Sequence, residues 1–428
     1  MSTQMIICLV IFVATLVSYM LNKIPMWVTA LLSLSALYIT KCIDATEALS
    51  GFANNNTVLM AACFILAMGF NKTSVVDKLC NFLLKVFKGS TWAVYCGYMI
   101  LAAILTNLIS SPMVCYAIVS PLLCSLLDKQ GESRSKYMFA LVVVCVGCCG
   151  ILPFATAVSQ AAQFTGFMET YGFTGGFDTM AFFWGRWPVM IVILLWAMFL
   201  APKTSPQQPI IPIAATEKKA KDTASKLSKF SDTAGIIIFF ASVILMVKAP
   251  FGMPSWFYAF FCALLMVMFG VVDQKAALSE IPWDMLMLYV GALALGTGLV
   301  NTGAGEMLGN WLAGVVGGTK NSYVIGALFF VIPFVITQFM LNRSVTAVFI
   351  PICLLTCSAL GANPIGPMML VQAGSLTAFM TPMATPAVPM AMADGGYDLN
   401  SLFKSGWLIS ILLCVVYIFF TMTIYPCF

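Results

Sequence analysis

The chain has 428 residues, of which 61% are hydrophobic and 9% are charged, with a formal net charge of +5 and no histidine. Soluble domains carry about 25% charged residues, so the composition excludes an ordinary water-soluble protein and predicts an all-α polytopic membrane protein. Lys and Arg lie mainly in loops, where they indicate membrane topology rather than nucleic-acid binding.

Apolar stretches long enough to cross a bilayer follow one another along the chain. No Lys or Arg precedes residues 5–21, so we interpret them as the first membrane helix and not as a cleavable signal peptide. Full crossings are expected at about 4–22, 26–42, 55–71, 138–166 and 181–201, and then at about 233–249, 255–272, 283–300, 366–392 and 404–425.

Two further apolar stretches, 92–126 and 322–361, are too long for one span and are interrupted by polar residues. The interruptions consist of Asn107, Ser110, Ser111 and Pro112 in the first stretch and Asn342, Arg343 and Ser344 in the second. Arms of about 15 residues are short for a crossing. We therefore expect re-entrant hairpins, whose tips are buried in protein or line a wet cavity.

A repeated pattern divides the chain into a first repeat, 1–202, a Lys-rich cytoplasmic linker, 203–232, and a second repeat, 233–428. Matching residues recur 229 or 230 positions apart, namely Pro25 and Pro254, Asp44 and Asp273, Pro121 and Pro351, and Pro153 and Pro382. Each copy has an odd number of crossings, so the second copy is predicted to be inverted, as in many secondary transporters. Basic residues at 72–91, 127–137 and in the linker predict that these segments are cytoplasmic and that both termini lie outside.

The last part of each repeat is predicted to contain a broken helix, at Gly150–Thr156 and at Phe379–Pro386. Proline frees a backbone carbonyl, and breaks at matching places in two repeats indicate a binding site. Hydroxyls and freed carbonyls suit a small cation as the coupling ion. The candidate ion ligands are Asn107, Ser111, Gly150, Thr156, Asn342 and Thr381. The alternative is that both breaks are simple proline kinks in a packed bundle.

The hairpin tips supply the candidate substrate ligands. These are Ser110, Ser111, Asn342, Arg343, Ser344, Thr385 and Pro386. A charge within the membrane is costly and by default marks function, and Arg343 can clamp a carboxylate with two hydrogen bonds. The alternative is a structural arginine tied to tip carbonyls. Asp284 stands at a helix start, where we expect a cap. No buried carboxylate suitable for a proton relay is recognisable.

Enzyme chemistry is not indicated, because the sequence has no Gly-rich phosphate loop, zinc signature or nucleophile–base set. The cluster Cys145, Cys148 and Cys149 is expected to pack between helices rather than to bind metal. We expect no cofactor besides a coupling ion.

Several motifs resemble the divalent anion:sodium symporter family of the ion transporter superfamily. They lie at Ala53–Val58, Ala67–Asp77, Ile281–Gly298, Met380–Tyr397 and Lys404–Trp407. The resemblance covers essentially the whole chain. It implies an elevator-type homodimer in the membrane, with a scaffold domain and a transport domain, that carries dicarboxylates, tricarboxylates or sulfate. Most such proteins use sodium, and some are sodium-independent exchangers.

The hairpin tips depart from the Ser-Asn-Thr pattern of that family, since they carry Ser111–Met113 and Leu341–Arg343. Arg343 stands where relatives have a small hydroxyl that helps to hold sodium, which predicts weaker sodium dependence or anion exchange. Two alternatives remain open. One is a cation/proton antiporter or metalloid efflux permease of the same superfamily, and the other is a channel-like or scaffold protein.

Overall fold

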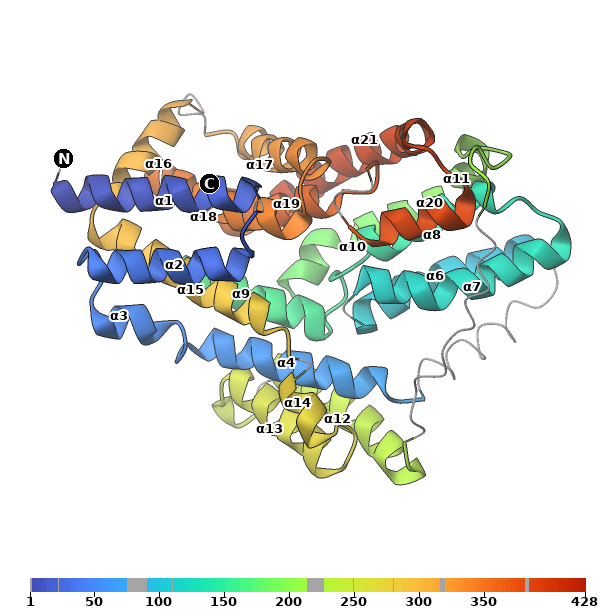
Figure 1. Cartoon of the computed structure of the whole chain (residues 1–428), viewed down its shortest axis with the longest axis horizontal. Helices are drawn as coiled ribbons and strands as arrows, with labels where there is room; N and C mark the ends of the chain where they lie inside the picture. The colour runs from blue at the N-terminus through green and yellow to red at the C-terminus, as the bar shows by residue number, and fades with distance from the viewer. Residues whose placement is uncertain are drawn as a thin grey trace.

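The computed structural model describes residues 2–21, 23–74, 91–109, 111–213, 227–248, 250–279, 281–315, 320–381 and 385–428. Within them every regular element is a helix (Figure 1). The first half contains α1 (Thr3–Leu21), α2 (Met26–Ile39), α3 (Ala45–Ser50), α4 (Asn55–Asn71), α6 (Thr91–Ile109), α7 (Pro112–Gln130), α8 (Met138–Gly147), α9 (Ala155–Thr170), α10 (Ala181–Leu195) and α11 (Ala201–Thr204).

The second half repeats this order of elements. It contains α12 (Lys229–Lys248), α13 (Ser255–Met268), α14 (Gln274–Ser279), α15 (Trp283–Asn301), α16 (Ala304–Val315), α17 (Ser322–Thr337), α18 (Asn342–Leu360), α19 (Ile365–Leu376), α20 (Ala387–Gly395) and α21 (Leu399–Ile424). The helix ends also correspond. Pro25 and Pro254 precede α2 and α13, and left-handed glycines, Gly131 and Gly361, end α7 and α18.

The helices are apolar enough for a membrane. Among the described residues, eight helical stretches are long and apolar enough to cross one. The hairpin arms are longer than the sequence suggested, because α6, α7 and α18 each have 19 residues and α17 has 16. Arm length is therefore not an argument for re-entry, which remains a prediction from the polar tips.

Both predicted broken helices are interrupted in the structure. The span expected at 138–166 consists of α8 and α9, with residues 148–154 between them, and the span at 366–392 consists of α19 and α20. Gly150, with φ +69°, lies in the left-handed region within the first interruption. Each pair of half-helices follows its hairpin in the chain.

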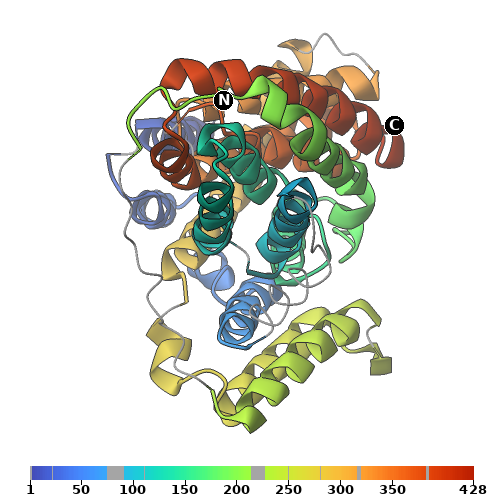
Figure 2. The ribbon, with the colours of Figure 1, turned by 90° about the vertical axis from the view of Figure 1, so that its right-hand side faces the viewer.

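The helices form one elongated bundle. Helices α4, α12 and α13 pack together along one edge, with α14 beside them, whereas α17, α19 and α21 pack along the opposite edge (Figures 1 and 2). The hairpin α6–α7 packs against α8, and α7 and α8 also contact α20. Helix α9 contacts α4 and α15 on one side and α6 and α10 on the other, so it connects the edge that contains α4 to the hairpin α6–α7 and α10.

Small residues allow the closest helix crossings. A Cβ at Gly291 of α15 would lie 2.5 Å from the carbonyl oxygen of Ala30 in α2, and one at Gly374 of α19 would lie 2.4 Å from that of Phe330 in α17. In both places the obstacle is backbone, which cannot rotate away. Close backbone approach at small residues is how membrane helices gain packing energy without a hydrophobic drive between them.

Candidate functional site

The first helix break is fastened to the end of α6 by two neighbouring residues. Thr106 Oγ1 donates to the Cys145 carbonyl oxygen at 2.6 Å, and Asn107 Nδ2 donates to that of Cys148 at 2.9 Å. Both side chains are fully buried. The carbonyls that the end of α8 leaves unpaired thus find donors on the hairpin, as buried backbone groups require.

Asn107 also holds the chain beyond the break. Its Oδ1 accepts hydrogen bonds from the backbone N–H groups of Ile151 and Leu152, both at 2.9 Å, and its Nδ2 donates a second bond to the Ala103 carbonyl oxygen at 2.7 Å. An amide offers two donors and two acceptor sites, so Asn107 is saturated. To bind an ion, as the sequence suggested, its oxygen would have to release one of these groups.

The second break is fastened by an equivalent pair at the end of α17. Thr337 Oγ1 donates to the Ser375 carbonyl oxygen at 2.9 Å, and Gln338 Nε2 donates to those of Thr377, at 3.0 Å, and Phe334, at 3.1 Å. Thr381, a predicted ion ligand, is buried and donates to the carbonyl oxygen of Gln338. In contrast to Asn107, Gln338 has a buried side-chain oxygen, Oε1, without a hydrogen-bond partner among the described residues.

The predicted tip residues begin the second arm of each hairpin. Ser111 caps α7 and accepts from the Val114 N–H at 3.4 Å. Asn342 opens α18, and its Oδ1 lies 2.9 Å from Thr337 Oγ1, which places it beside the second break. Ser344 is buried, with its hydroxyl 3.1 Å from Met26 Sδ. Ser110 lies outside the described residues.

Arg343 has a partner that sequence reasoning missed. Its Nη1 lies 3.3 Å from Asp284 Oδ2 at the start of α15, and both side chains are more than half exposed. Asp284 lies in the first turn of α15, where a carboxylate is expected to favour the helix dipole. It makes no capping hydrogen bond, because no side chain caps α15, and its carboxylate pairs with Arg343. The ion pair joins the hairpin α17–α18 to a helix outside it.

The remaining predicted residues lie at the breaks. A side chain at Gly150 would meet Gln160 Oε1 at 2.9 Å. Thr156 stands in the first turn of α9, whereas Thr385 is buried just before α20, which Pro386 precedes. Within the second break, Pro382, Met383 and Ala384 lie outside the described residues.

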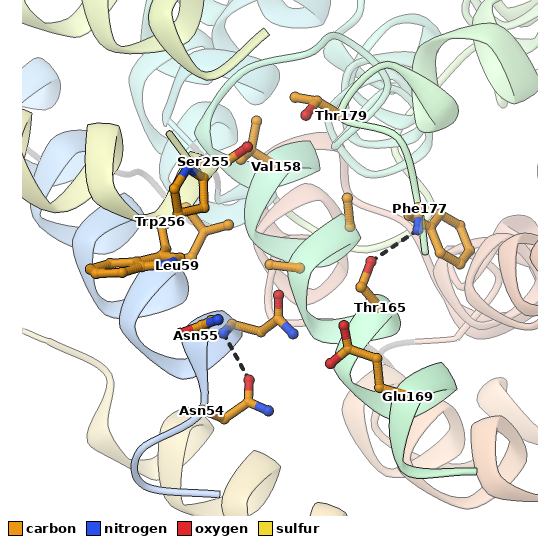
Figure 3. Close-up of a pocket in the computed structure, with 14 residues that line it drawn as sticks. Asn54, Asn55, Leu59, Val158, Thr165, Glu169, Phe177, Thr179, Ser255 and Trp256 are labelled. Atoms are coloured by element: carbon orange, nitrogen blue, oxygen red, sulfur yellow. Dashed lines mark hydrogen bonds between the residues drawn. The ribbon is translucent and has the colours of Figure 1, made fainter. Parts of the chain in front are cut away.

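A polar cavity of about 280 Å³ lies along α9 (Figure 3). It is lined by Asn54, Asn55, Asn56, Leu59, Val158, Ala161, Ala162, Thr165, Glu169, Phe177, Thr179, Pro254, Ser255 and Trp256. Val158 is two residues beyond Thr156, and Glu169 is an exposed residue at the other end of the helix. The cavity therefore runs from near the first break to the surface, over about 16 Å at 1.5 Å per helical residue.

This cavity has a distinct electrostatic character. None of the residues that line it is basic, and Glu169 is its one acidic side chain. The three asparagines at the start of α4 carried part of the family resemblance, but the sequence did not identify them as a site. A run of three amides before an apolar helix is the signal that would have indicated it.

Arg186 is a second residue that sequence reasoning missed. It lies in α10, is fully buried, and donates from Nη2 to the Tyr417 hydroxyl at 3.1 Å. The guanidinium also faces the rings of Phe182 and Tyr417, 5.9 and 5.5 Å from their centroids. A lone arginine inside the apolar stretch 181–201 was a readable signal, because intramembrane charges are rare and functional.

The buried cysteines form a small cluster around the first break. Cys145 Sγ lies 3.5 Å from Cys115 Sγ, and Cys149 Sγ lies 3.7 Å from the Thr106 carbonyl oxygen. The described residues contain no group of three His, Cys, Asp or Glu side chains arranged to hold a metal ion. The cluster packs the hairpin against α8.

Comparison with known proteins places this architecture among transporters. The model of the citrate transporter family matches residues 9–365 and, in a second match, 243–427. An uncharacterized transporter of Haemophilus influenzae is 31% identical over 160 residues, which are 37% of this chain and 34% of that protein. The chain thus matches about a third of the length of that relative.

Two more distant matches cover most of the chain. The sodium-dependent dicarboxylate transporter SdcS of Staphylococcus saprophyticus is 20% identical over 92% of this chain and 81% of that protein. The solved structure of MtrF of Neisseria gonorrhoeae, described within a class of antimetabolite efflux pumps, has a TM-score of 0.66 and 12% identity, and covers 99% of this chain and 95% of that one. At this identity the structural match shows the fold alone.

Proposed function

Since the chain belongs to the citrate transporter family, within the ion transporter superfamily, we propose that it is a secondary carrier of a small di- or tricarboxylate or sulfate-like anion. The family and the relatives are transporters, so the chain is not an enzyme. The resemblance to divalent anion:sodium symporters is confirmed by the match with SdcS and with a human member of solute carrier family 13.

One observation carries the proposal beyond family membership. Each half has a broken helix whose freed carbonyls are held by a threonine and an amide on the preceding hairpin, Thr106 with Asn107 and Thr337 with Gln338. Simple kinks do not need this matched arrangement. Broken helices paired across two repeats form the solute and ion sites of secondary transporters, which supports a site between these breaks.

The overall plan is proposed on the same basis. The halves 1–202 and 233–428 are inverted repeats, the segment 203–232 is cytoplasmic, and both termini face outside. The hairpins are re-entrant. Together with the broken helices they form a transport domain that moves by an elevator mechanism, and the protein is a homodimer. The recurring element order and the odd number of crossings support the repeats.

The substrate is proposed to bind at the hairpin tips and the broken helices. The proposed substrate residues are Ser110, Ser111, Asn342, Arg343, Ser344, Thr385 and Pro386. The proposed ligands of a coupling cation are Asn107, Ser111, Gly150, Thr156, Asn342 and Thr381. Arg343 contributes the positive charge. Because a substrate carboxylate and Asp284 compete for the same guanidinium, anion binding releases the hairpin from α15.

Uptake into proteoliposomes tests the proposal. Proteoliposomes that contain the full chain should accumulate labelled citrate, succinate or sulfate. Uptake of each anion is measured once in sodium buffer and once in choline buffer. We expect at least one of these anions to be taken up, and we expect an excess of its unlabelled form to reduce uptake of the label by competition.

An empty-vesicle control and a vesicle containing the Arg343→Gln variant accompany each measurement. Uptake of none of these anions, together with cation-driven proton movement or metalloid-anion efflux, would contradict the proposal and favour the antiporter or efflux alternatives.

A further inference from the structure

The cavity along α9 lies where three helices meet (Figure 3). Its lining includes the first residues of α4, Asn55 and Asn56, and the first residues of α13, Ser255 and Trp256. It also includes Glu169, in the last turn of α9. The starts of two helices and the end of a third therefore face one space of about 280 Å³.

The start of α13 makes one side of this cavity electropositive. Unpaired N–H groups at a helix start carry a partial positive charge. No side chain caps α13, and its first N–H group with an acceptor in the described chain is that of Phe257, which donates to the Pro254 carbonyl oxygen at 3.0 Å. The N–H groups of Ser255 and Trp256 are thus available to an acceptor in the cavity.

Glu169 makes the other side of the cavity electronegative. It is the one charged side chain among the described residues of the lining, it is exposed, and the end of α9 beside it carries a partial negative charge. Helix α4 packs against both α9 and α13, so the asparagines at its start lie between the two sides. Figure 3 accordingly shows Ser255 and Trp256 across the cavity from Glu169.

A buried hydroxyl behind α4 adds an unused polar group. Tyr289 of α15 is fully buried, and its hydroxyl has no hydrogen-bond partner among the described residues. A Cβ at Gly166 would lie 1.8 Å from this oxygen and 3.1 Å from Nδ2 of Asn56, so these two atoms are within about 5 Å of each other. A buried polar atom without a partner is costly, and one oxygen or nitrogen atom of a ligand at Asn56 would reach it.

We infer that this cavity binds a small zwitterion, whose carboxylate faces the N–H groups of Ser255 and Trp256 and whose ammonium group faces Glu169. An anion without an ammonium group would meet the Glu169 carboxylate, and no basic side chain of the described lining would offset the repulsion. A cation without a carboxylate would leave the α13 amides unused. The site is separate from the breaks and the hairpin tips, so the inference goes beyond the proposed function and does not depend on the transported solute.

Thermal unfolding of the purified full chain in detergent tests this inference, with glycine, γ-aminobutyrate, butyrate and butylamine as probes at constant ionic strength. At least one of the two zwitterions should raise the melting temperature along a saturable curve. Butyrate and butylamine each carry one of the two charges of γ-aminobutyrate on a chain of equal length. Their half-saturating concentrations should be about tenfold higher or more than that of the zwitterion that binds.

Four variants locate the site. Glu169→Gln removes the partner of the ammonium group and should raise the half-saturating zwitterion concentration about tenfold or more. Ser255→Pro removes one N–H group at a helix position that tolerates proline, and it should also weaken binding. Glu306→Gln, a matched change at an exposed glutamate outside the cavity, should leave the curve unchanged. Arg343→Gln should leave it unchanged as well, because the hairpin tip is a different site.

Three results would overturn the inference. They are the absence of saturable stabilisation by either zwitterion, equally tight binding of butyrate or butylamine, and an unchanged curve in Glu169→Gln.

Discussion

The Asp284→Asn substitution tests whether Arg343 is shared between Asp284 and the transported anion. The Nη1–Oδ2 separation is 3.3 Å, which corresponds to an attraction of about 5 kcal/mol at an effective dielectric constant of about 20 before solvation is counted. Exposed pairs retain only about 0.2–1 kcal/mol of this, and both side chains are more than half exposed, at 58% and 53%. The net cost of releasing Arg343 is therefore small.

A neutral asparagine leaves Arg343 free for the substrate. We expect Asp284→Asn to lower the KM of the carboxylate about two- to fivefold, because 1 kcal/mol is about fivefold in a dissociation constant. Arg343→Gln should raise the KM, and the double variant should resemble Arg343→Gln alone. Initial uptake rates against substrate concentration measure both effects. They should weaken at high salt, since exposed charges are screened.

Two results would refute the reasoning. An unchanged KM in Asp284→Asn, with a raised KM in Arg343→Gln, would show that Asp284 does not compete with the anion. An equal rise of KM in both variants would show that Asp284 orients Arg343 for the substrate instead.

The other predictions use the same protein. Thr156→Val and Thr385→Val keep the side-chain shape and remove the hydroxyls at the two breaks, so uptake should fall about tenfold or more at normal expression; wild-type kinetics in both would mean that the breaks are kinks. Gly374→Ala places a Cβ 2.4 Å from the Phe330 carbonyl oxygen and should destabilise the fold by about 1–3 kcal/mol, whereas Gly314→Ala, with open space around it, should not lower the melting temperature. A cysteine at position 225 should be labelled from the cytoplasmic side, and labelling from outside would contradict the inverted topology. Arg134 donates to Asp128 and lowers the pKa of that carboxyl. The pair should stabilise the fold by at most about 1 kcal/mol at neutral pH, and this stabilisation should be lost as the pH falls below about 4. The measurement is the difference in melting temperature between the wild type and Asp128→Asn as a function of pH. A difference that disappears when the pH is raised instead would contradict the prediction.

The helices and their order were predictable from the sequence because hydropathy and proline report local constraints. A bilayer fixes the length of an apolar stretch, and proline fixes where a helix loses a hydrogen bond. The structure accordingly interrupts both spans near Pro153 and after Leu376. The lengths of the hairpin arms were underestimated from the sequence. The polar residues were treated as interruptions, whereas Ser111 and Asn342 stand at the start of the second arm's helix.

The partners of the polar residues were not predictable. Asp284 and Arg343 are 59 positions apart, and Arg186 and Tyr417 are 231 apart. Neither spacing follows from a helical period, so only the packing of the bundle brings these side chains together. The cavity along α9 was missed for the same reason, since its lining comes from α4, α9, α13 and the loop that holds Phe177 and Thr179.

Asn107 and Gln338 occupy equivalent positions at the two breaks, and their side chains differ by one methylene group. Both Asn107 and Gln338 donate to the carbonyl four residues before them and to one at the end of a half-helix. The shorter Asn107 also brings its oxygen to two backbone N–H groups, whereas the oxygen of the longer Gln338 has no such partner in the described part of the chain. With the donors fixed by the same backbone, the extra carbon displaces only the acceptor. A single side-chain difference therefore pairs every hydrogen-bonding position of the amide at the first break and leaves one acceptor unpaired, among the described residues, at the second.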